Sequence, residues 1–410
     1  MRFMRNTLIL FLVLSLLVVA VPVFASDRGA SGKVNPDRLL VKFKDGVSND
    51  AKRGIHLRHG ATVVGEVAGL GVQIVEVGAS KASEREREYQ AESSVEYVEP
   101  DYMLEAFVDD PGLMNQWGLN NVGQIVNGIA GTIDADIDAW EAWDVTTSTP
   151  DVIIAILDTG IDQDHADLAG QIIGNKNFTS SGTVDDLYGH GTHVAGIAAA
   201  AANNGIGVAG LAYGAGIMNV KVLGDDGSGY TSWVASGINW AADNGAKVIN
   251  MSLGGSTGSR TLESAINYAW SKGVVVVAAG GNSASSAKQY PAAYTNCIAV
   301  AATDQNDNKA YFSSFGSKWI DVAAPGVNIY STLPNHSNRI GGTDYGYLSG
   351  TSMSTPYVAG LAALVWSTGY GNTATNVRGR IVGAADKPVS GNIYKKYGIP
   401  RINAFKAVMP

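Results

Sequence analysis

Short runs of valine, isoleucine and alanine recur along the chain after about Asp109, and helix-length patterns separate them. These runs carry apolar residues on both faces, so they predict strands that are buried on both faces. Strands of this kind that alternate with helices form a parallel sheet covered on both sides. We therefore predict a doubly wound, mostly parallel α/β domain, with strands at VIIAIL, VKVL, AKVINMSL, VVVVAA and CIAVAA.

The first residues have the composition of a secretory signal. Arg2 and Arg5 precede a long apolar run, and residues 1–25 end in Val-Phe-Ala before Ser26. The run is close to membrane-spanning length, so a retained anchor is the alternative, but Pro22 and the small-residue ending favour cleavage. We expect a secreted, extracellular protein from which residues 1–25 are removed.

Residues 26–107 have a composition of their own. They contain the strand patterns RLLVKFK and GVQIVEV, and after these comes the densely charged stretch KASEREREYQ. Two strand patterns and a charged helix pattern predict a small α+β domain with a folded core at about 37–107. We expect its histidines, His56 and His59, at the surface, and the larger domain over 108–410.

Composition excludes several classes of function. A chain of 410 residues that is 46% hydrophobic and 16% charged can bury a full core. Its net charge of -8 and the absence of a Lys or Arg run argue against nucleic acid as a partner. The single cysteine, Cys297, can form neither an intrachain disulfide nor a cysteine zinc cluster, and we expect it in the core. We expect a monomer that does not associate with a membrane after processing.

Polar residues directly after the predicted strands are the candidates for chemistry, because ligands bind beyond the carboxyl ends of such sheets. Asp158 follows DVIIAIL, and Asn282 follows VVVVAAGG. Taken alone, Asp158 fits an ordinary turn equally well, and Asn282 after two glycines fits a turn better than a catalytic role. Together with a base and a nucleophile, they would serve as the orienting acid and as an amide donor to a negative oxygen.

The stretch GHGTHVAGIAAAAA supplies the base. It places His190 at the start of a helix and His193 one turn further on. A zinc protease needs His-Glu-x-x-His, whereas Gly191 and Thr192 separate these histidines, so metal binding by the pair is disfavoured. An imidazole oriented by a carboxylate is instead a general base, and Asp158 is the expected partner.

The stretch GTSMSTPYVAG supplies the nucleophile. Ser352 stands where small residues give way to a helix pattern, and serine is also a favoured helix cap. We expect Ser352 to act as the nucleophile while it occupies the cap position, since both roles place it at the helix N-terminus.

The motifs DTGID, GHGTHVAG and GTSMSTPYVAG, in this order and with Asn282 before the third, resemble the subtilisin-like serine proteases, most closely the thermitase-like branch. The resemblance implies a secreted endopeptidase with the triad Asp158, His190 and Ser352 and the oxyanion residue Asn282. It further implies that residues 26–107 form an inhibitory prodomain that assists folding. We expect self-cleavage between Met103 and Asp109.

The resemblance also implies a substrate cleft for protein and peptide chains. Two segments would line it and pair with an extended peptide as neighbouring strands. With no acidic residue in either stretch apart from Asp225 and Asp226 at the loop's start, we expect a broad preference for large apolar or aromatic side chains before the cut bond. The two segments are Gly227, Ser228, Gly229 and Ser252, Leu253, Gly254.

A calcium ion is the implied cofactor. AANNGIGVAG resembles the calcium loop of the family, whose ligands are all oxygens. Some thermitase-like relatives hold a second ion where Asp185 and Asp186 stand, but this loop differs too much from theirs for ligands to be assigned. The expected ligands of the first ion are the side chains of Asp110, Asp167 and Asn204 and the carbonyls of Ala202, Ile206 and Val208.

Two alternatives compete with this interpretation. GGSTG matches the nucleophile elbow of α/β-hydrolases, with Ser256 as the nucleophile and His336 downstream. This esterase hypothesis leaves Asp158, His190 and Asn282 without a role. The other alternative is a catalytically silent member of the family that only binds peptides, although all four catalytic residue types are present.

Overall fold

The computed structural model describes residues 34–78, 81–102, 109–387 and 392–410. The chain divides into two compact units, Met1–Ala106 and Phe107–Pro410. The predicted signal, residues 1–25, and the predicted cleavage window between Met103 and Asp109 lie outside the described residues, except for Asp109 itself. Within the described residues, no helix has the length and apolar character needed to cross a bilayer.

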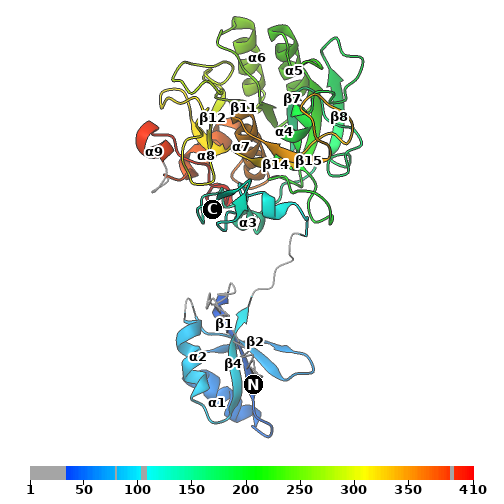
Figure 1. Cartoon of the computed structure of the whole chain (residues 1–410). Helices are drawn as coiled ribbons and strands as arrows, with labels where there is room; N and C mark the ends of the chain where they lie inside the picture. Colours follow the sequence, from blue (N-terminus) through cyan, green and yellow to red (C-terminus); the bar gives the residue numbers. More distant parts are fainter. Residues whose placement is uncertain (1–33, 79–80, 103–108, 388–391) are drawn as a thin grey trace, which may run out of the picture. The chain divides into compact units, whose positions relative to one another are not determined.

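The N-terminal unit is a four-stranded antiparallel sheet with two helices (Figure 1). Its strand order is β2-β3-β1-β4. Leu39, Val41 and Tyr89 lie in its buried core. The elements are β1 (Val34–Phe43), α1 (Asn49–Arg58), β2 (Thr62–Val67), β3 (Val72–Glu76), α2 (Ala82–Gln90) and β4 (Val95–Tyr102).

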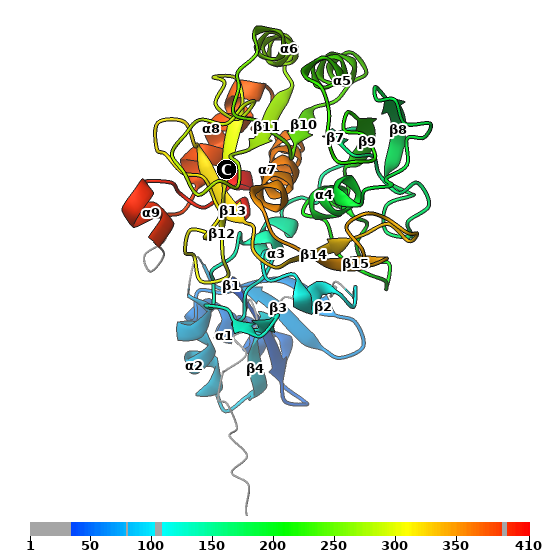
Figure 2. The same ribbon diagram turned by 45° about the horizontal axis from the view of Figure 1, so that its top comes forward.

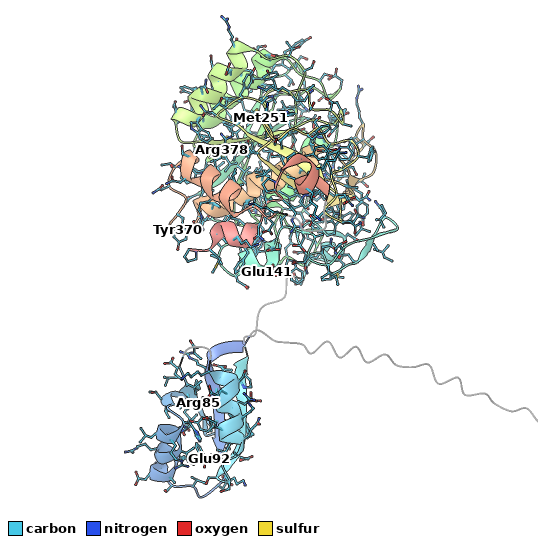
Figure 3. The ribbon with its side chains drawn as sticks, turned by 90° about the vertical axis from the view of Figure 1, so that its left-hand side faces the viewer. Arg85, Glu92, Glu141, Met251, Tyr370 and Arg378 are labelled. Atoms are coloured by element: carbon cyan, nitrogen blue, oxygen red, sulfur yellow. The ribbon has the colours of Figure 1, made fainter. Side chains whose placement is uncertain are left out.

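One expectation for this unit is wrong. His56 is buried, and its ring nitrogens bond with Tyr89 Oη at 2.7 Å and Gln73 Oε1 at 2.9 Å. Burial lowers the pKa of His56, which matches a core histidine held by neutral partners. His59 is half-buried between Glu88 and Glu92; Glu92 is labelled in Figure 3.

The C-terminal unit contains a seven-stranded sheet in the order β13-β12-β11-β10-β7-β9-β8. Every neighbouring pair in it is parallel, which confirms the predicted fold class. The strands are β7 (Ile153–Asp158), β8 (Ile172–Asn177), β9 (Gly216–Lys221), β10 (Val248–Met251), β11 (Val275–Ala279), β12 (Ile298–Thr303) and β13 (Val322–Pro325).

Helices cover both faces of this sheet (Figures 1 and 2). Along β7, Ile154 and Ile156 join one buried cluster, whereas Ala155 and Leu157 join the other. This alternation explains why apolar residues occupy successive positions along the strand: each face needs its own apolar side chains. One face packs against α4 (His190–Ala199), α7 (Thr351–Trp366) and α8 (Ala374–Ala384), and the other against α5 (Thr231–Asp243) and α6 (Arg260–Ser271).

Smaller elements complete the unit. Cys297 is buried before β12, as predicted. A short antiparallel hairpin of β14 (Ile329–Thr332) and β15 (Tyr345–Leu348) precedes α7. The remaining elements are η1 (Leu113–Asn115), β5 (Ile125–Val126), β6 (Ile129–Ala130), α3 (Ala139–Trp143), α9 (Asn392–Tyr397) and α10 (Ala404–Val408).

The strand order fixes where a site can form. β7 lies between β9 and β10, so the chain leaves β7 toward one side of the sheet and later continues on the other. Such a switch point opens a crevice at the carboxyl ends of the strands. Asp158 is the last residue of β7 and therefore stands at this crevice.

Candidate active site

The carboxylate of Asp158 and the imidazole of His190 form a close pair. Their atoms Oδ1 and Nδ1 are 2.7 Å apart, and Asp158 is completely buried while His190 keeps one edge open to solvent. Thr159 N–H donates to the same carboxylate oxygen at 2.8 Å, whereas Asp158 Oδ2 is buried without a hydrogen-bond partner. The pair therefore holds the ring with Nδ1 toward the acid, which leaves Nε2 for chemistry.

Neighbouring charges tune His190. Burial, the largest single influence, lowers its pKa, but the charge and hydrogen bond of Asp158 and the charge of Asp186 outweigh burial and raise the pKa above its ordinary value. The sequence did not predict that Asp186 would lie beside His190. Its carboxylate accepts hydrogen bonds from Thr159 Oγ1, Tyr188 N, Gly189 N, Thr192 N and Thr192 Oγ1, and so fixes the start of α4.

Ser352 lies in the first turn of α7 and not at its cap. The N-cap is Gly350, and no side chain caps this helix, so the expectation that Ser352 occupies the cap position is wrong. Ser352 Oγ donates to the carbonyl oxygen of Ser252 at 3.1 Å, and Ser252 Oγ donates to the carbonyl oxygen of Ser352 at 2.7 Å. This reciprocal pair joins the start of α7 to the segment that follows β10.

The side chain of Asn282 has a fixed orientation. Its Oδ1 accepts hydrogen bonds from the N–H and the hydroxyl of Thr351, both at 2.9 Å. Thr351 Oγ1 in turn accepts from Gly281 N at 3.0 Å. Because the oxygen is engaged, the amide nitrogen of Asn282 is the end that remains to donate.

Two cavities adjoin these residues. One of about 180 Å³ is lined by Asn282, Thr351 and Ser352 together with Leu253, Gly254, Ala279, Gly281 and Gln289. The other, of about 530 Å³, contains His190 and all six residues of the two predicted cleft segments, Gly227, Ser228, Gly229, Ser252, Leu253 and Gly254. The cavities share Leu253 and Gly254, so they form neighbouring parts of one groove.

The alternative nucleophile stands elsewhere. Ser256 is exposed in a bend, and α6 begins only after a cap at Ser259. His336 contacts Asp185 and not Ser256. The strand-turn-helix geometry that an esterase elbow requires is therefore missing at GGSTG.

His193 has a structural environment. It is buried on α4, its Nε2 faces the carbonyl oxygen of Gly346 at 3.1 Å, and burial lowers its pKa to about 3. A histidine that stays neutral in the core carries no charge for catalysis.

The predicted calcium loop brings two buried carboxylates together. Asp110 accepts hydrogen bonds from the N–H groups of Asn203 and Asn204, and Asp167 accepts from the Asn204 amide and from Val208 N. The pKa of Asp110 is raised. Burial is the largest cause, and the negative charges of Asp167 and Asp109 add to the increase. Within the described part of the chain, no Lys or Arg forms an ion pair with either carboxylate.

Sequence reasoning missed one group at this loop. The Tyr345 hydroxyl hydrogen-bonds Asp167, and burial followed by the charge of Asp167 raises the pKa of Tyr345. Uncompensated acidic oxygens around one loop are the donor set that suits a hard divalent cation, so the residues fit calcium. Ala202 and Ile206 belong to the same loop, where Ile206 N–H bonds with Asn204 Oδ1 at 3.1 Å.

Comparison with known proteins gives consistent matches. Residues 149–399 match the model of the subtilase family, and residues 21–101 match the model of the fervidolysin N-terminal prodomain. Thermitase of Thermoactinomyces vulgaris is 51% identical over 273 residues, which cover 66% of this chain and 93% of that protein.

Further relatives show the same pattern. The thermophilic serine proteinase of Bacillus sp. strain AK1 is 50% identical over 268 residues, 65% of this chain and 64% of that protein. Subtilisin BL of Lederbergia lenta is 48% identical over 244 residues, 59% of this chain and 86% of that protein. Among solved structures, a protease from Pseudoalteromonas arctica matches with a TM-score of 0.65 and 34% identity, covering 74% of this chain and 99% of that one.

Proposed function

The chain belongs to the subtilase family of serine endopeptidases, and from that premise we propose that Asp158, His190 and Ser352 form its catalytic triad. The observation that supports this assignment most is the 2.7 Å contact between a completely buried carboxylate and an imidazole that lines the groove. A buried acid of this kind holds its histidine in one tautomer and stabilises the imidazolium that forms during proton transfer.

In the proposed mechanism, Ser352 Oγ attacks the carbonyl carbon of the scissile peptide. His190 takes the hydroxyl proton and later gives it to the leaving amine, while Asp158 stays ionised. Ser352 Oγ donates to Ser252 in the free protein. The hydroxyl therefore has to rotate toward His190 when substrate enters, as catalytic hydrogen bonds often tighten only in the substrate complex.

Asn282 is proposed as the oxyanion donor. Thr351 holds its carbonyl oxygen, so the amide N–H groups are available to the negative oxygen of the tetrahedral intermediate. Such a donor lowers the barrier because it is already oriented before charge develops.

The groove suits an extended peptide. The segments 227–229 and 252–254 would pair with the substrate backbone by β-augmentation. The cavity beside Ser352 has only uncharged lining residues, which supports a preference for apolar or aromatic side chains before the cut bond. A panel of peptide anilides that differ only in that residue tests this preference, and a strict requirement for Arg or Lys would refute it.

The calcium proposal rests on the buried acidic loop. Asp110 and Asp167 would supply side-chain oxygens, and Ala202, Ile206 and Val208 would supply carbonyls. Asn204 would supply its side-chain oxygen after its amide turns over, because its nitrogen faces Asp167. When bound, a calcium ion would neutralise the two carboxylates and link the segment around Asp110 to the loop before β9. Its role would be structural.

We further infer that the chain is made as a secreted zymogen. Residues 1–25 would direct export, and the N-terminal unit would act as an intramolecular inhibitor and folding aid, as its match to a prodomain supports. Self-cleavage between Met103 and Asp109 would release an active, soluble monomer. An N-terminus of the secreted form outside this window would refute that part of the proposal.

The decisive experiment treats the secreted, processed protein with a serine-directed phosphonylating reagent and maps the adduct. An adduct on Ser352 that is lost in His190→Ala supports the triad. An adduct on Ser256, or no adduct in protein freed of residues 26–107, contradicts it.

A further inference from the structure

A second group of potential metal ligands lies outside the calcium loop. Asp162, Asp185 and His336 each offer one ligand atom, and these atoms lie within 4.8 Å of one another. The residues come from three separate segments: the chain after β7, the chain before α4, and the connection between β14 and β15. No sequence motif brings these three residues together.

In its neutral form, His336 has a tautomer that leaves a lone pair directed into the group. Its Nδ1 is 3.1 Å from the carbonyl oxygen of Ser337, and because a carbonyl can only accept, Nδ1 carries the proton. Nε2 is buried and has no hydrogen-bond partner, yet it lies 3.4 Å from Asp185 Oδ2. A bare nitrogen facing a carboxylate is repulsive unless a proton or a metal ion lies between them.

The imidazole has the environment of a metal-binding histidine. In most metal sites, the ligating histidine donates its other ring N–H to a carbonyl or carboxylate, which orients the ring. The Ser337 carbonyl provides this contact for His336.

The carboxylates are oriented but not neutralised. Asp162 is only 1% exposed, and its two oxygens accept hydrogen bonds from Asp164 N at 3.1 Å and Asn335 N at 2.7 Å. Burial raises the pKa of Asp162 despite these bonds, and the charge of Asp185 adds to the increase. Each carboxylate oxygen keeps a second lone pair for a further ligand.

The nearby Lys221 is engaged elsewhere. Lys221 Nζ donates to the main-chain oxygen of Asp185 at 2.9 Å, and its charge pairs with Asp225 at 2.9 Å. In the described ranges, no Lys or Arg forms an ion pair with Asp162 or Asp185. Two carboxylates against a single imidazole leave the group with net negative charge whenever His336 is neutral.

We propose that Asp162, Asp185 and His336 bind a divalent cation of the zinc class, separate from the calcium loop. Mixed nitrogen and oxygen ligands suit zinc, whereas calcium takes oxygens alone. Two ligand atoms at about 2.0–2.2 Å from a tetrahedral zinc ion are about 3.4 Å apart. The separation of His336 Nε2 and Asp185 Oδ2 has this value.

Two features complete the site. Asp162 would move inward by on the order of 1 Å to reach the ion at a normal bond length. The side chains of Asp185 and His336 are 30% and 31% exposed, so the ion has a path from solvent and water can fill the fourth position. A bound ion would fasten the segments that carry Asp158 and His190 to the β14–β15 connection.

The test uses the full-length chain with Ser352→Ala, which removes autolysis. The protein is stripped with a chelator, returned to excess calcium to fill oxygen-only sites, and titrated with Zn²⁺ by calorimetry. We expect one zinc ion whose binding is weakened by about 100-fold or more in His336→Ala and at least about 10-fold in Asp185→Asn. Asp151→Asn, an exposed acid before β7 at the opposite end of that strand, is the matched control and should bind zinc like the parent.

Each other outcome overturns the proposal. Equal zinc binding in His336→Ala and the parent would assign the ion to other residues, including His59 of the N-terminal unit. Displacement of zinc by calcium would mean an oxygen-only site. If the parent binds no zinc, His336 is the protonated partner of two carboxylates and nothing more. Thermal unfolding of each zinc-free variant verifies that all of them fold.

Discussion

Substitution of Asn282 should separate activity from stability, because its two side-chain atoms have different partners. Oδ1 accepts two hydrogen bonds from Thr351, and the amide nitrogen is the proposed donor to the substrate. Asn282→Ala removes both functions. Asn282→Asp keeps an oxygen for Thr351 and replaces the donor by a negative charge.

The expected magnitudes depend on these contacts. Loss of one oxyanion donor lowers kcat about 100- to 1000-fold, a range known from a subtilisin and therefore carried over within the family. In Asn282→Asp, a second charge about 4 Å from the oxyanion adds roughly 4 kcal/mol of repulsion at an effective dielectric constant of about 20. We therefore expect Asn282→Asp to be at least about tenfold slower than Asn282→Ala.

Stability should change in the opposite order. Asn282→Ala leaves the N–H and hydroxyl of the buried Thr351 without their acceptor, at a cost of about 1–3 kcal/mol. Asn282→Asp retains both bonds and should unfold within about 0.5 kcal/mol of the parent, the usual range for changes that break no such contact.

The assay compares kcat and KM on a peptide anilide at pH 8 with chemical unfolding of the same variants after the active site is blocked. Asn376→Ala is the control, because it removes only an exposed side-chain hydrogen bond from Asn376 on α8 to Asn372. It should leave the kinetic constants and the stability unchanged. The assignment of Asn282 fails if Asn282→Asp keeps near-normal kcat, or if both variants lose the same stability.

Three further predictions concern pH, metal and the single thiol. Because Asp158 and Asp186 raise the pKa of His190 and only neutral His190 can accept a proton, kcat/KM should fall as pH drops through a midpoint above 6.5, and a pH profile with a midpoint at or below 6.5 contradicts this. Chelation of calcium should lower Tm by several degrees, since an ion at 100 times its Kd contributes about 2.7 kcal/mol. Asp167→Asn should abolish that response, and a parent Tm indifferent to chelator refutes the site. Cys297 is buried with a raised pKa, so a thiol reagent should react only after unfolding, which absorbance of the released chromophore measures.

Much of the fold was predictable because its signal is local. A strand buried on both faces is mainly apolar, and β7, β9, β10, β11 and β12 all carry a short run rich in Val, Ile, Met or Ala. The edge strand β8 and the β14–β15 hairpin had no such signal. β8 reads IIGNKN and has exposed or half-exposed side chains at all its positions, so it lacks the apolar run of the buried strands.

The family and the enzyme class were also predictable, since three motifs in one order are specific, and the comparisons confirm both. The orienting residues were not predictable. Asp186 acts through bonds to Thr159 and Thr192, and Thr351 acts through Asn282, so their roles depend on segments that are distant in sequence. His56 was misplaced for the same reason, because its partner Tyr89 belongs to another helix.

These orienting contacts share one arrangement. A residue adjacent in sequence to one proposed catalytic residue forms hydrogen bonds with a different catalytic residue or with its segment. Thr159, next to Asp158, bonds with Gly191 N, next to His190, at 2.9 Å. Thr351, next to Ser352, fixes Asn282, and Ser252 of the proposed substrate wall exchanges hydrogen bonds with Ser352. A displacement of one segment must therefore displace the group on the next. Catalysis by positioned groups tolerates errors of only about 0.5 Å. This mutual bracing explains how groups from separate strand ends and helix starts keep one geometry without a disulfide.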